Sequence, residues 1–132
     1  MQPFTIKCHS VGKSAPLHSF FILSRGPNTG RPSYTPNVNC FVFSCASQDI
    51  DRYYWLIYAM WNSRKFEKYF RGSVIQYILL DDLKLIIAKA SKKITAIDTY
   101  VDTLQKFLIL EAKLKKQIEM IHIGRCSLLQ AI

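Results

Sequence analysis

Short apolar runs separated by turn-forming residues mark the first 45 positions of the chain. FTIKCHS, residues 4–10, alternates apolar and polar side chains as a half-buried strand does. SFFILSRG, residues 19–26, and VNCFVFSC, residues 38–45, are rich in aromatic and β-branched residues and predict two more strands, with either set of alternate residues of the latter facing the core. Between them, the prolines of residues 26–37 fix φ and lack a donor, so this segment is predicted to be a loop.

The next segment has the spacing of a helix. One face of it is formed by Ile50, Tyr54, Ile57, Tyr58 and Trp61. Ser47 is the predicted N-cap, and Asp49 and Asp51 complement the helix dipole in the first turn. We expect a second short helix that is capped by Ser63 and ended by Gly72. Five aromatic residues fall in the first helix at helical spacing, which favours core packing over a stacking platform for single-stranded nucleic acid.

A strand, a short helix and a long helix are predicted for the remainder. SVIQYILL, residues 73–80, has strand composition, and a helix over residues 81–90 begins at Asp81 or Asp82. The chain is therefore expected to have an α+β fold, a small and mostly antiparallel sheet with a packed aromatic helix and a long C-terminal helix. The predicted parts are a domain of residues 1–91, the long helix at residues 92–123 and a tail at residues 124–132.

The long helix carries the spacing of a coiled coil. Steps of three and four residues separate Ile94, Ile97, Val101, Leu104 and Leu108. A second series with a shifted phase follows at Phe107, Leu114, Ile118 and Ile121, and Gly124 is expected to end the helix. About 30 residues span roughly 45 Å, more than a domain of this size needs. Two alternatives remain, a core helix that crosses the domain and an interface for a homodimer or protein partner through Ile97, Val101, Leu104, Leu108 and Ile118.

The length and composition of the chain favour one folded domain that does not span a membrane. The chain has 132 residues, 49% of them hydrophobic, which is enough for one core. Its apolar stretches are shorter than the roughly 20 residues that cross a bilayer, and the first residues lack the pattern of a secretory signal. A cytoplasmic protein without a membrane partner is expected.

The net charge of +9 is unevenly distributed. Five of the lysines and arginines lie in residues 1–63 and thirteen in residues 64–132, whereas the acids divide as two and seven. Such an excess is typical of proteins that bind polyanions, although a solvated helix face has the same composition.

Catalytic and metal-binding patterns are not found in the sequence. Cys40 and Cys45 do not have the spacing of a zinc ribbon, and buried or free thiols are the simpler interpretation, so no metal and no cofactor are expected. A metal site that gathers Cys8, His9, Cys40 and Cys45 is the weaker alternative. Adjacent Asp81 and Asp82 are typical of a helix start, and no nucleophile elbow, phosphate loop or zinc-protease motif occurs. We therefore expect no catalytic residues and no enzymatic activity.

Residues 62–86 carry a resemblance to a known family. NSRKFEKYF is followed by RGSVIQYILLDDLKLI and then by a helix with coiled-coil spacing. This order resembles the target-recognition domain and following helix of specificity subunits in type I restriction-modification systems, which commonly show a short helix, Gly-Ser, a strand and Asp-Leu-Lys before the spacer. The chain departs from that family in having one recognition unit and in carrying IIAKASKKI where a proline-bearing connector is usual.

A second similarity covers more of the chain. SFFILSRGPNTGRP, NCFVFSC, YYWLIYAMW and FRGSVIQYI are similar to a small bacterial family of unknown function associated with mobile elements. Together the two similarities imply a stand-alone relative of one recognition unit.

The first resemblance implies a surface for duplex DNA. Gly72 and Ser73 would lie in a loop close to DNA, Arg71 would contact a phosphate or a guanine, and sequence-independent attraction would come from Arg64, Lys65 and Lys68. A second surface, in the loop, would contain Arg25, Asn28, Thr29 and Arg31, with Tyr34 either stacking on a base or covering the core. The alternative interpretation of residues 64–72 is a helix C-terminus whose cations satisfy the last carbonyls.

Non-catalytic binding of duplex DNA is the function that these observations favour. One alternative is a protein-interaction module of a phage or mobile element, a decoy or partner of a host restriction complex that acts through the long helix. Another is a structural component of a larger assembly.

Overall fold

A four-stranded antiparallel sheet and two helices form the first unit of the protein. The computed structural model describes residues 3–93 and 97–131, and the chain divides into two compact units at the boundary between Ile97 and Asp98. The strands are β1 (Thr5–His9), β2 (Ser19–Leu23), β3 (Pro32–Ser33) and β4 (Cys40–Ser44), in the order β1-β4-β2-β3. The helices of this unit are α1 (Ile50–Asn62) and α2 (Leu80–Lys93), with a 3-10 turn, η1, at Glu67–Tyr69. The α+β fold expected from the sequence is confirmed.

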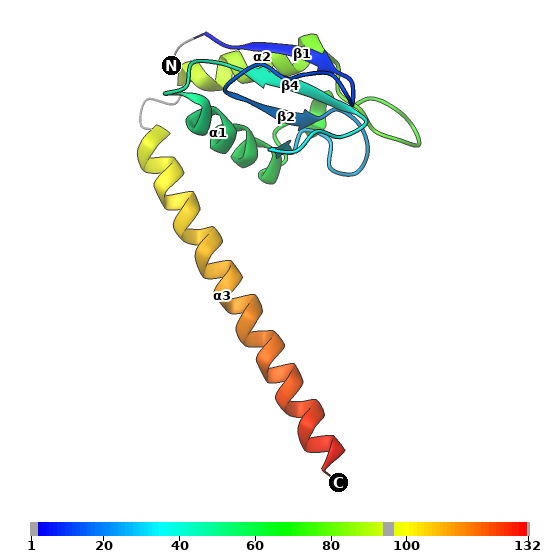
Figure 1. Ribbon diagram of the computed structural model, residues 1–132, viewed down its shortest axis with the longest axis vertical. Helices are drawn as coiled ribbons and strands as arrows, with labels where there is room; N and C mark the ends of the chain where they lie inside the picture. The colour runs from blue at the N-terminus through cyan, green and yellow to red at the C-terminus, as the bar shows by residue number, and fades with distance from the viewer. Residues whose placement is uncertain (1–2, 94–96, 132) are drawn as a thin grey trace. The chain divides into compact units, whose positions relative to one another are not determined.

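The core lies between the sheet and α1. Phe43 of the central strand β4 faces Ile6 of β1 and Phe20 of β2 across the ladder, and all three side chains are fully buried. Tyr53 of α1 packs on Phe43 with 5.0 Å between ring centroids, so α1 covers this face. Burying each such side chain contributes about 1.5–3 kcal/mol. Helix α2 runs along β1 (Figure 1), and it buries Leu83, Ile86 and Ile87.

The other face of the sheet buries a smaller cluster. Phe21, Cys40 and Val42 point to this side, because they alternate with the core residues along β2 and β4. His9 contacts Phe21 with 4.9 Å between ring centroids and covers part of the cluster. The second face is therefore only partly buried, because Thr5 and Lys7 of β1 lie on it and stay exposed.

Helix α1 differs from its prediction in its first residue and in its buried face. Asp49, rather than Ser47, is the N-cap, and the Asp49 side chain is buried with Arg52 3.5 Å away. The buried residues of α1 are Tyr53, Leu56, Ile57, Ala59 and Met60. Tyr54, Tyr58 and Trp61 of the predicted face are half-buried. The buried face is therefore rotated away from the predicted one, which was centred on the large aromatic rings. Those rings line the edge of the core because their polar atoms need access to water or a partner.

The chain after α1 also differs from its prediction. Ser63 is the C-cap of α1 and donates its hydroxyl to the carbonyl of Ala59 at 2.8 Å, so it does not begin a second helix. Residues 73–80 do not form a strand, since Tyr77 alone pairs, with Arg25 and with Arg71. Gly72 ends no helix, because η1 already stops at Tyr69 and Phe70 is extended.

The second unit contains α3 (Ile97–Gln130), the one secondary-structure element described there. Residues 94–96, including Ile94 of the predicted stripe, lie outside the described residues. The helix continues through Gly124, so the predictions that Gly124 ends it and that residues 124–132 form a tail are wrong. A single glycine costs a helix only about 1 kcal/mol, which is too little to end it by itself.

Candidate functional site

Tyr77 joins the two cationic segments that the sequence analysis singled out. Its backbone exchanges two hydrogen bonds with Arg71, at 2.9 and 3.0 Å, and it also forms a bridge with Arg25. The neighbouring carbonyl of Gln76 accepts from the N–H of Gly26 at 2.9 Å. The Arg25 guanidinium lies 6.0 Å from the centre of the Tyr77 ring, at the outer limit of a cation–π contact. Residues 25–31 and 71–77 therefore form one continuous surface.

Thr29 and Gly30 fix the two segments from the inside. The buried Thr29 hydroxyl donates to the carbonyl of Gly26 at 2.6 Å and also lies 3.3 Å from that of Gln76, so it bridges the two segments. Gly30 has φ +92°, and a Cβ there would collide with the ring of Phe66, so glycine lets that ring pack directly on the loop backbone. The loop of residues 26–31 is consequently an ordered part of the domain.

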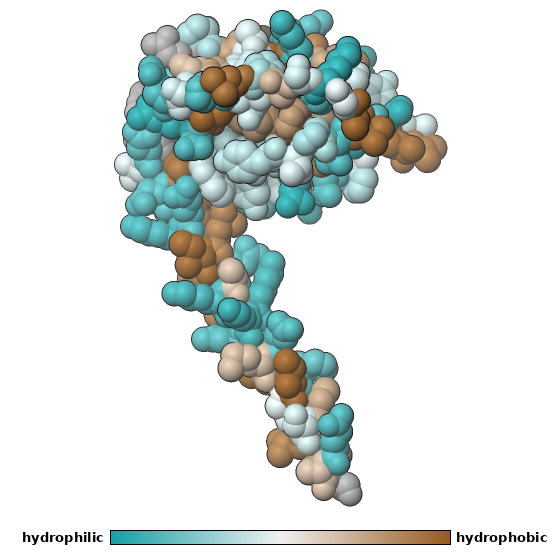
Figure 2. All heavy atoms as spheres, viewed as in Figure 1, coloured by the Kyte–Doolittle hydropathy of each residue, from teal (hydrophilic) through white to brown (hydrophobic). Residues whose placement is uncertain are grey.

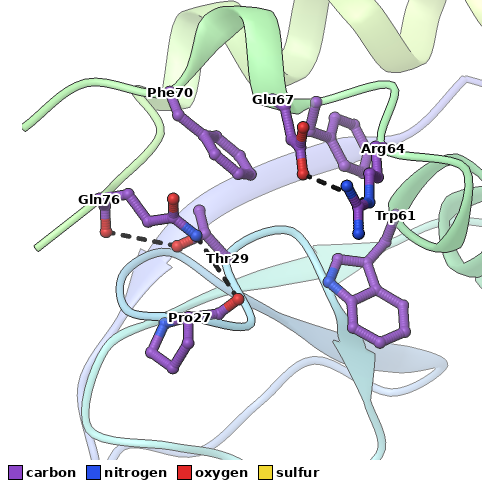
Figure 3. Close-up of a pocket in the computed structure, with 8 residues that line it drawn as sticks. Pro27, Thr29, Trp61, Arg64, Glu67, Phe70 and Gln76 are labelled. Carbon is purple, nitrogen blue, oxygen red and sulfur yellow. Dashed lines mark hydrogen bonds and ion pairs between the residues drawn. The ribbon is translucent and has the colours of Figure 1, made fainter.

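A small cavity lies at this junction (Figure 3). Its volume is about 50 Å³, room for one or two water molecules and far below the several hundred Å³ of a typical ligand pocket. Its lining is Pro27, Thr29, Trp61, Arg64, Phe66, Glu67, Phe70 and Gln76. The cavity is thus too small to bind a small organic molecule.

Arg31 and Arg64 come from different segments, and each lies beside a residue that lines the cavity. The Arg31 guanidinium lies 5.3 Å from the centre of the Trp61 ring, within cation–π range. Arg64 Nε lies 3.7 Å from a carboxylate oxygen of Glu67, and both side chains are largely exposed. An exposed pair of this kind contributes little to stability, so the Arg64 guanidinium is available to an anion.

Arg64 occupies a backbone position that glycine usually takes. The Lys65 N–H bonds to the carbonyl of Met60 at 2.9 Å and the Arg64 N–H to that of Trp61 at 3.1 Å, the two bonds of a Schellman motif at the end of α1. Arg64 has φ +62°, in the left-handed region, which is strained for a side chain with a Cβ. The helix-terminus interpretation is therefore correct for the backbone of this segment, with Arg64 rather than Gly72 at the turn.

Relief of this strain should be measurable. Arg64→Gly is expected to be about 1 kcal/mol more stable than Arg64→Ala, because both variants lose the guanidinium and only glycine adopts the left-handed conformation without cost. Urea unfolding followed by tryptophan fluorescence measures the difference. Equal free energies of unfolding for the two variants would show that the backbone at this turn is not strained.

The loop of residues 72–76 extends away from the sheet and has an apolar tip. Gly72 has φ +97°, and a Cβ there would collide with the carbonyl oxygen of Ile75, so the tight return of the chain requires glycine. Ser73 is exposed, Val74 is 93% exposed and Ile75 54%. The loop projects from the first unit in Figure 1, and its tip is brown in Figure 2. An open cleft of about 370 Å³ separates it from Gly26 and Pro27.

Lys65, Lys68 and Arg71 remain exposed beside this junction. Lys68 lies 5.3 Å from the centre of the Tyr69 ring, and Arg71 lies 3.8 Å from a carboxylate oxygen of Asp82. The structure thus brings the predicted residues of the two segments onto neighbouring loops. The sequence pattern does not reveal the apolar tip at Val74 and Ile75, because it assigns both residues to a strand.

Tyr34 stacks on Tyr54, with 4.2 Å between ring centroids and 10° between ring planes. Burial raises the pKa of the Tyr34 phenol, and Asp51 adds to the effect. Burial also raises the pKa of Tyr54, while Arg31 acts in the opposite direction. Both phenols therefore stay protonated near neutral pH and can donate hydrogen bonds.

Among residues 3–93 and 97–131, no group of three or more His, Cys, Asp or Glu side chains is arranged to hold a metal ion. Within the same ranges, no helix has the length and apolar character needed to cross a bilayer.

Helix α3 carries the predicted interface residues. Val101, Leu104 and Leu108 are half-exposed and Ile118 is 67% exposed. The side chain of Ile97 lies outside the described part of the chain. Hydrophobic and hydrophilic residues, brown and teal in Figure 2, are interspersed along this helix.

These features define an α+β protein with a cation-rich loop surface and a long helix that exposes apolar side chains. Residues 6–131 match a family of unknown function, DUF6943, and the chain belongs to that family. No curated protein matches the chain. No solved structure matches it either.

Proposed function

We propose that this protein binds duplex DNA without catalysing a reaction, as a single unit similar to the target-recognition domains of type I specificity subunits. The observation that carries the proposal is the junction at Tyr77. Residues 25–31 and 64–77 together contain six cations and one carboxylate, and the junction ties these segments together by backbone hydrogen bonds. Phosphate contacts from such clusters supply most of the affinity of DNA-binding proteins.

The surface has features suited to a nucleic acid backbone. Its cations come from loops and turns, which reach further from the domain than residues on a sheet face. Ser73, at the exposed loop, can donate a hydrogen bond to a phosphate, and the exposed guanidinium of Arg71 is of the kind that makes bidentate contacts with guanine. The strain retained at Arg64 also supports a binding role, because non-glycine residues in this conformation are enriched at functional sites.

Salt dependence tests the proposal directly. Fluorescence anisotropy with a labelled random-sequence duplex should show binding at about 50 mM salt that weakens steeply as salt rises. Each phosphate contact contributes about −0.9 to the slope of log K against log salt, so four or five contacts predict a slope of about −4. Absence of binding at low salt, or a slope near zero, would contradict DNA binding through these cations.

A second function, docking to another protein, is favoured by the exposed apolar side chains of α3. Under this proposal the protein acts as an interaction module, such as a partner of a restriction complex. Its test is the pair of changes Leu104→Glu and Leu108→Glu, which should abolish assembly and leave any DNA binding by the first unit intact.

A further inference from the structure

Helix α3 has one continuous heptad pattern. Steps of four and three residues connect Tyr100, Leu104, Phe107, Glu111, Leu114, Ile118, Ile121, Arg125 and Leu128. Seven of these nine residues are apolar, and the series shares Leu104, Phe107, Leu114, Ile118 and Ile121 with the two shifted series expected from the sequence. Alternating steps of three and four are the pattern of a coiled-coil seam.

The seam is unpartnered within its unit. Six of its apolar residues are between 46% and 72% exposed, among them Phe107 at 64% and Ile118 at 67%. In Asp98–Ile132, α3 is the one element that the structure describes, so nothing in the described part of that unit covers the seam. A helix of this kind gains most of its stability from packing its apolar face against a partner.

The two charged residues of the seam determine which partner fits. Glu111 and Arg125 occupy equivalent heptad positions and have opposite charges. In a parallel pair of identical helices, each residue would face its own copy, which places two carboxylates together and two guanidiniums together in the seam. Like charges in such a layer are costly, so a parallel homodimer is disfavoured.

An antiparallel pair brings the opposite charges together. When Leu104 faces Leu128 of a second copy, Leu114 faces Ile118 of that copy and Phe107 faces its Arg125. Glu111 then lies about 6 Å along the axis from Arg125 of the second copy, one helical turn. Because helical side chains lean toward their own N-terminus, these two lean toward each other.

We propose that α3 pairs with α3 of a second copy of this chain as an antiparallel two-stranded coiled coil, in which Glu111 of each copy meets Arg125 of the other. The two contacts are equivalent by the two-fold axis, and each guanidinium also stacks near a Phe107 ring. Lys115 lies near the axis at the edge of the seam, where it keeps Glu111 of its own helix as a counter-ion at 3.2 Å. This inference deepens the use of α3 as an interface and does not depend on DNA binding.

Charge exchange tests the pairing. Sedimentation equilibrium of the full chain without DNA should give a dimer for the wild type. Glu111→Arg and Arg125→Glu should each weaken the dimer at least about tenfold, because each places like charges across the antiparallel seam. The double variant Glu111→Arg with Arg125→Glu should recover to within a fewfold of the wild type.

Three results would overturn the pairing, and they can be told apart from one another. A parallel dimer would tolerate either single change, since each replaces one like-charge layer by another. Docking to the first unit of the same chain, or to a different protein, would leave the wild type monomeric. If the double variant did not recover the dimer, Glu111 of one copy would not contact Arg125 of the other. Tryptophan fluorescence of Trp55 and Trp61, both in α1, checks that the first unit stays folded in every variant.

Two further sets of variants control for surface effects and for orientation. Ile109 and Ile123 are 58% and 57% exposed and fall on the side of the heptad away from the seam, so Ile109→Gln and Ile123→Gln should leave the dimer unchanged. In a background with Cys8→Ser and Cys126→Ser, a mixture of Leu104→Cys and Leu128→Cys chains should form cross-linked dimers. Leu104→Cys alone should not, and efficient cross-linking of that variant to itself would overturn the antiparallel orientation.

The dimer proposal and the DNA-binding proposal can each be contradicted without affecting the other. Neither dimer measurement contains DNA, so a monomeric protein would leave the DNA-binding proposal standing. A protein that dimerises as described but does not bind a duplex would overturn DNA binding alone.

Discussion

Phe43→Ala should lower the free energy of unfolding of the first unit by about 3–5 kcal/mol. The Phe43 ring is fully buried in the central strand β4. Its centroid lies 4.7 Å from that of Phe20, 5.2 Å from that of Phe4 and 5.0 Å from that of Tyr53. Alanine would leave a cavity between two strands and α1, where neither layer can close without breaking the ladder.

Urea unfolding followed by tryptophan fluorescence measures this loss. Leu17→Ala is a suitable control, because it also shortens an apolar side chain but at a position 83% exposed, and it should change stability by less than about 0.5 kcal/mol. A loss under about 1 kcal/mol for Phe43→Ala would show that this ring is not central to the core.

The triple change Lys65→Ala, Lys68→Ala and Arg71→Ala should weaken binding to a random-sequence duplex on the order of a hundredfold near 0.1 M salt. All three side chains are exposed, so their truncation removes phosphate contacts with little effect on the fold. The salt slope should also become less steep, by about 0.9 for each phosphate that the variant no longer neutralises. Fluorescence anisotropy at several salt concentrations measures both effects.

The matched control removes the same charge elsewhere. Lys7→Ala, Lys13→Ala and Lys89→Ala change three exposed lysines of the first unit outside residues 64–77. If this control weakens binding as much as the first triple variant, the attraction arises from net charge and not from the Tyr77 junction. If neither variant changes binding, residues 65, 68 and 71 do not contact DNA.

The strands of the fold were predictable because their signal is local. β1, β2 and β4 fall within the three predicted runs, the first identified by alternation of apolar and polar residues and the other two by their aromatic and β-branched composition. β3 has no such signal, since its two residues lie at a sheet edge and Pro32 argues against a central strand. The start of α2 near Asp81 was predicted from the acidic residues of its first turn.

The candidate site was only partly predictable. The cations were visible as composition, but their arrangement depends on hydrogen bonds between residues about 50 positions apart, such as Gly26 to Gln76. The run SVIQYILL has strand composition, yet Gly72 reverses the chain so tightly that Tyr77 alone pairs. No local pattern distinguishes these two outcomes, because the deciding contacts are made by Arg25 and Arg71 from different parts of the chain.

Thr29 has a consequence for the thermodynamics of recognition. Its buried hydroxyl and the adjoining backbone bonds hold residues 25–31 and 71–77 in one arrangement. The ordering entropy of both loops is then lost when the protein folds, and the later encounter with a ligand costs less. A surface with fixed spacing favours a ligand whose charges are also regularly spaced, and it gains least from a flexible chain that must itself become ordered.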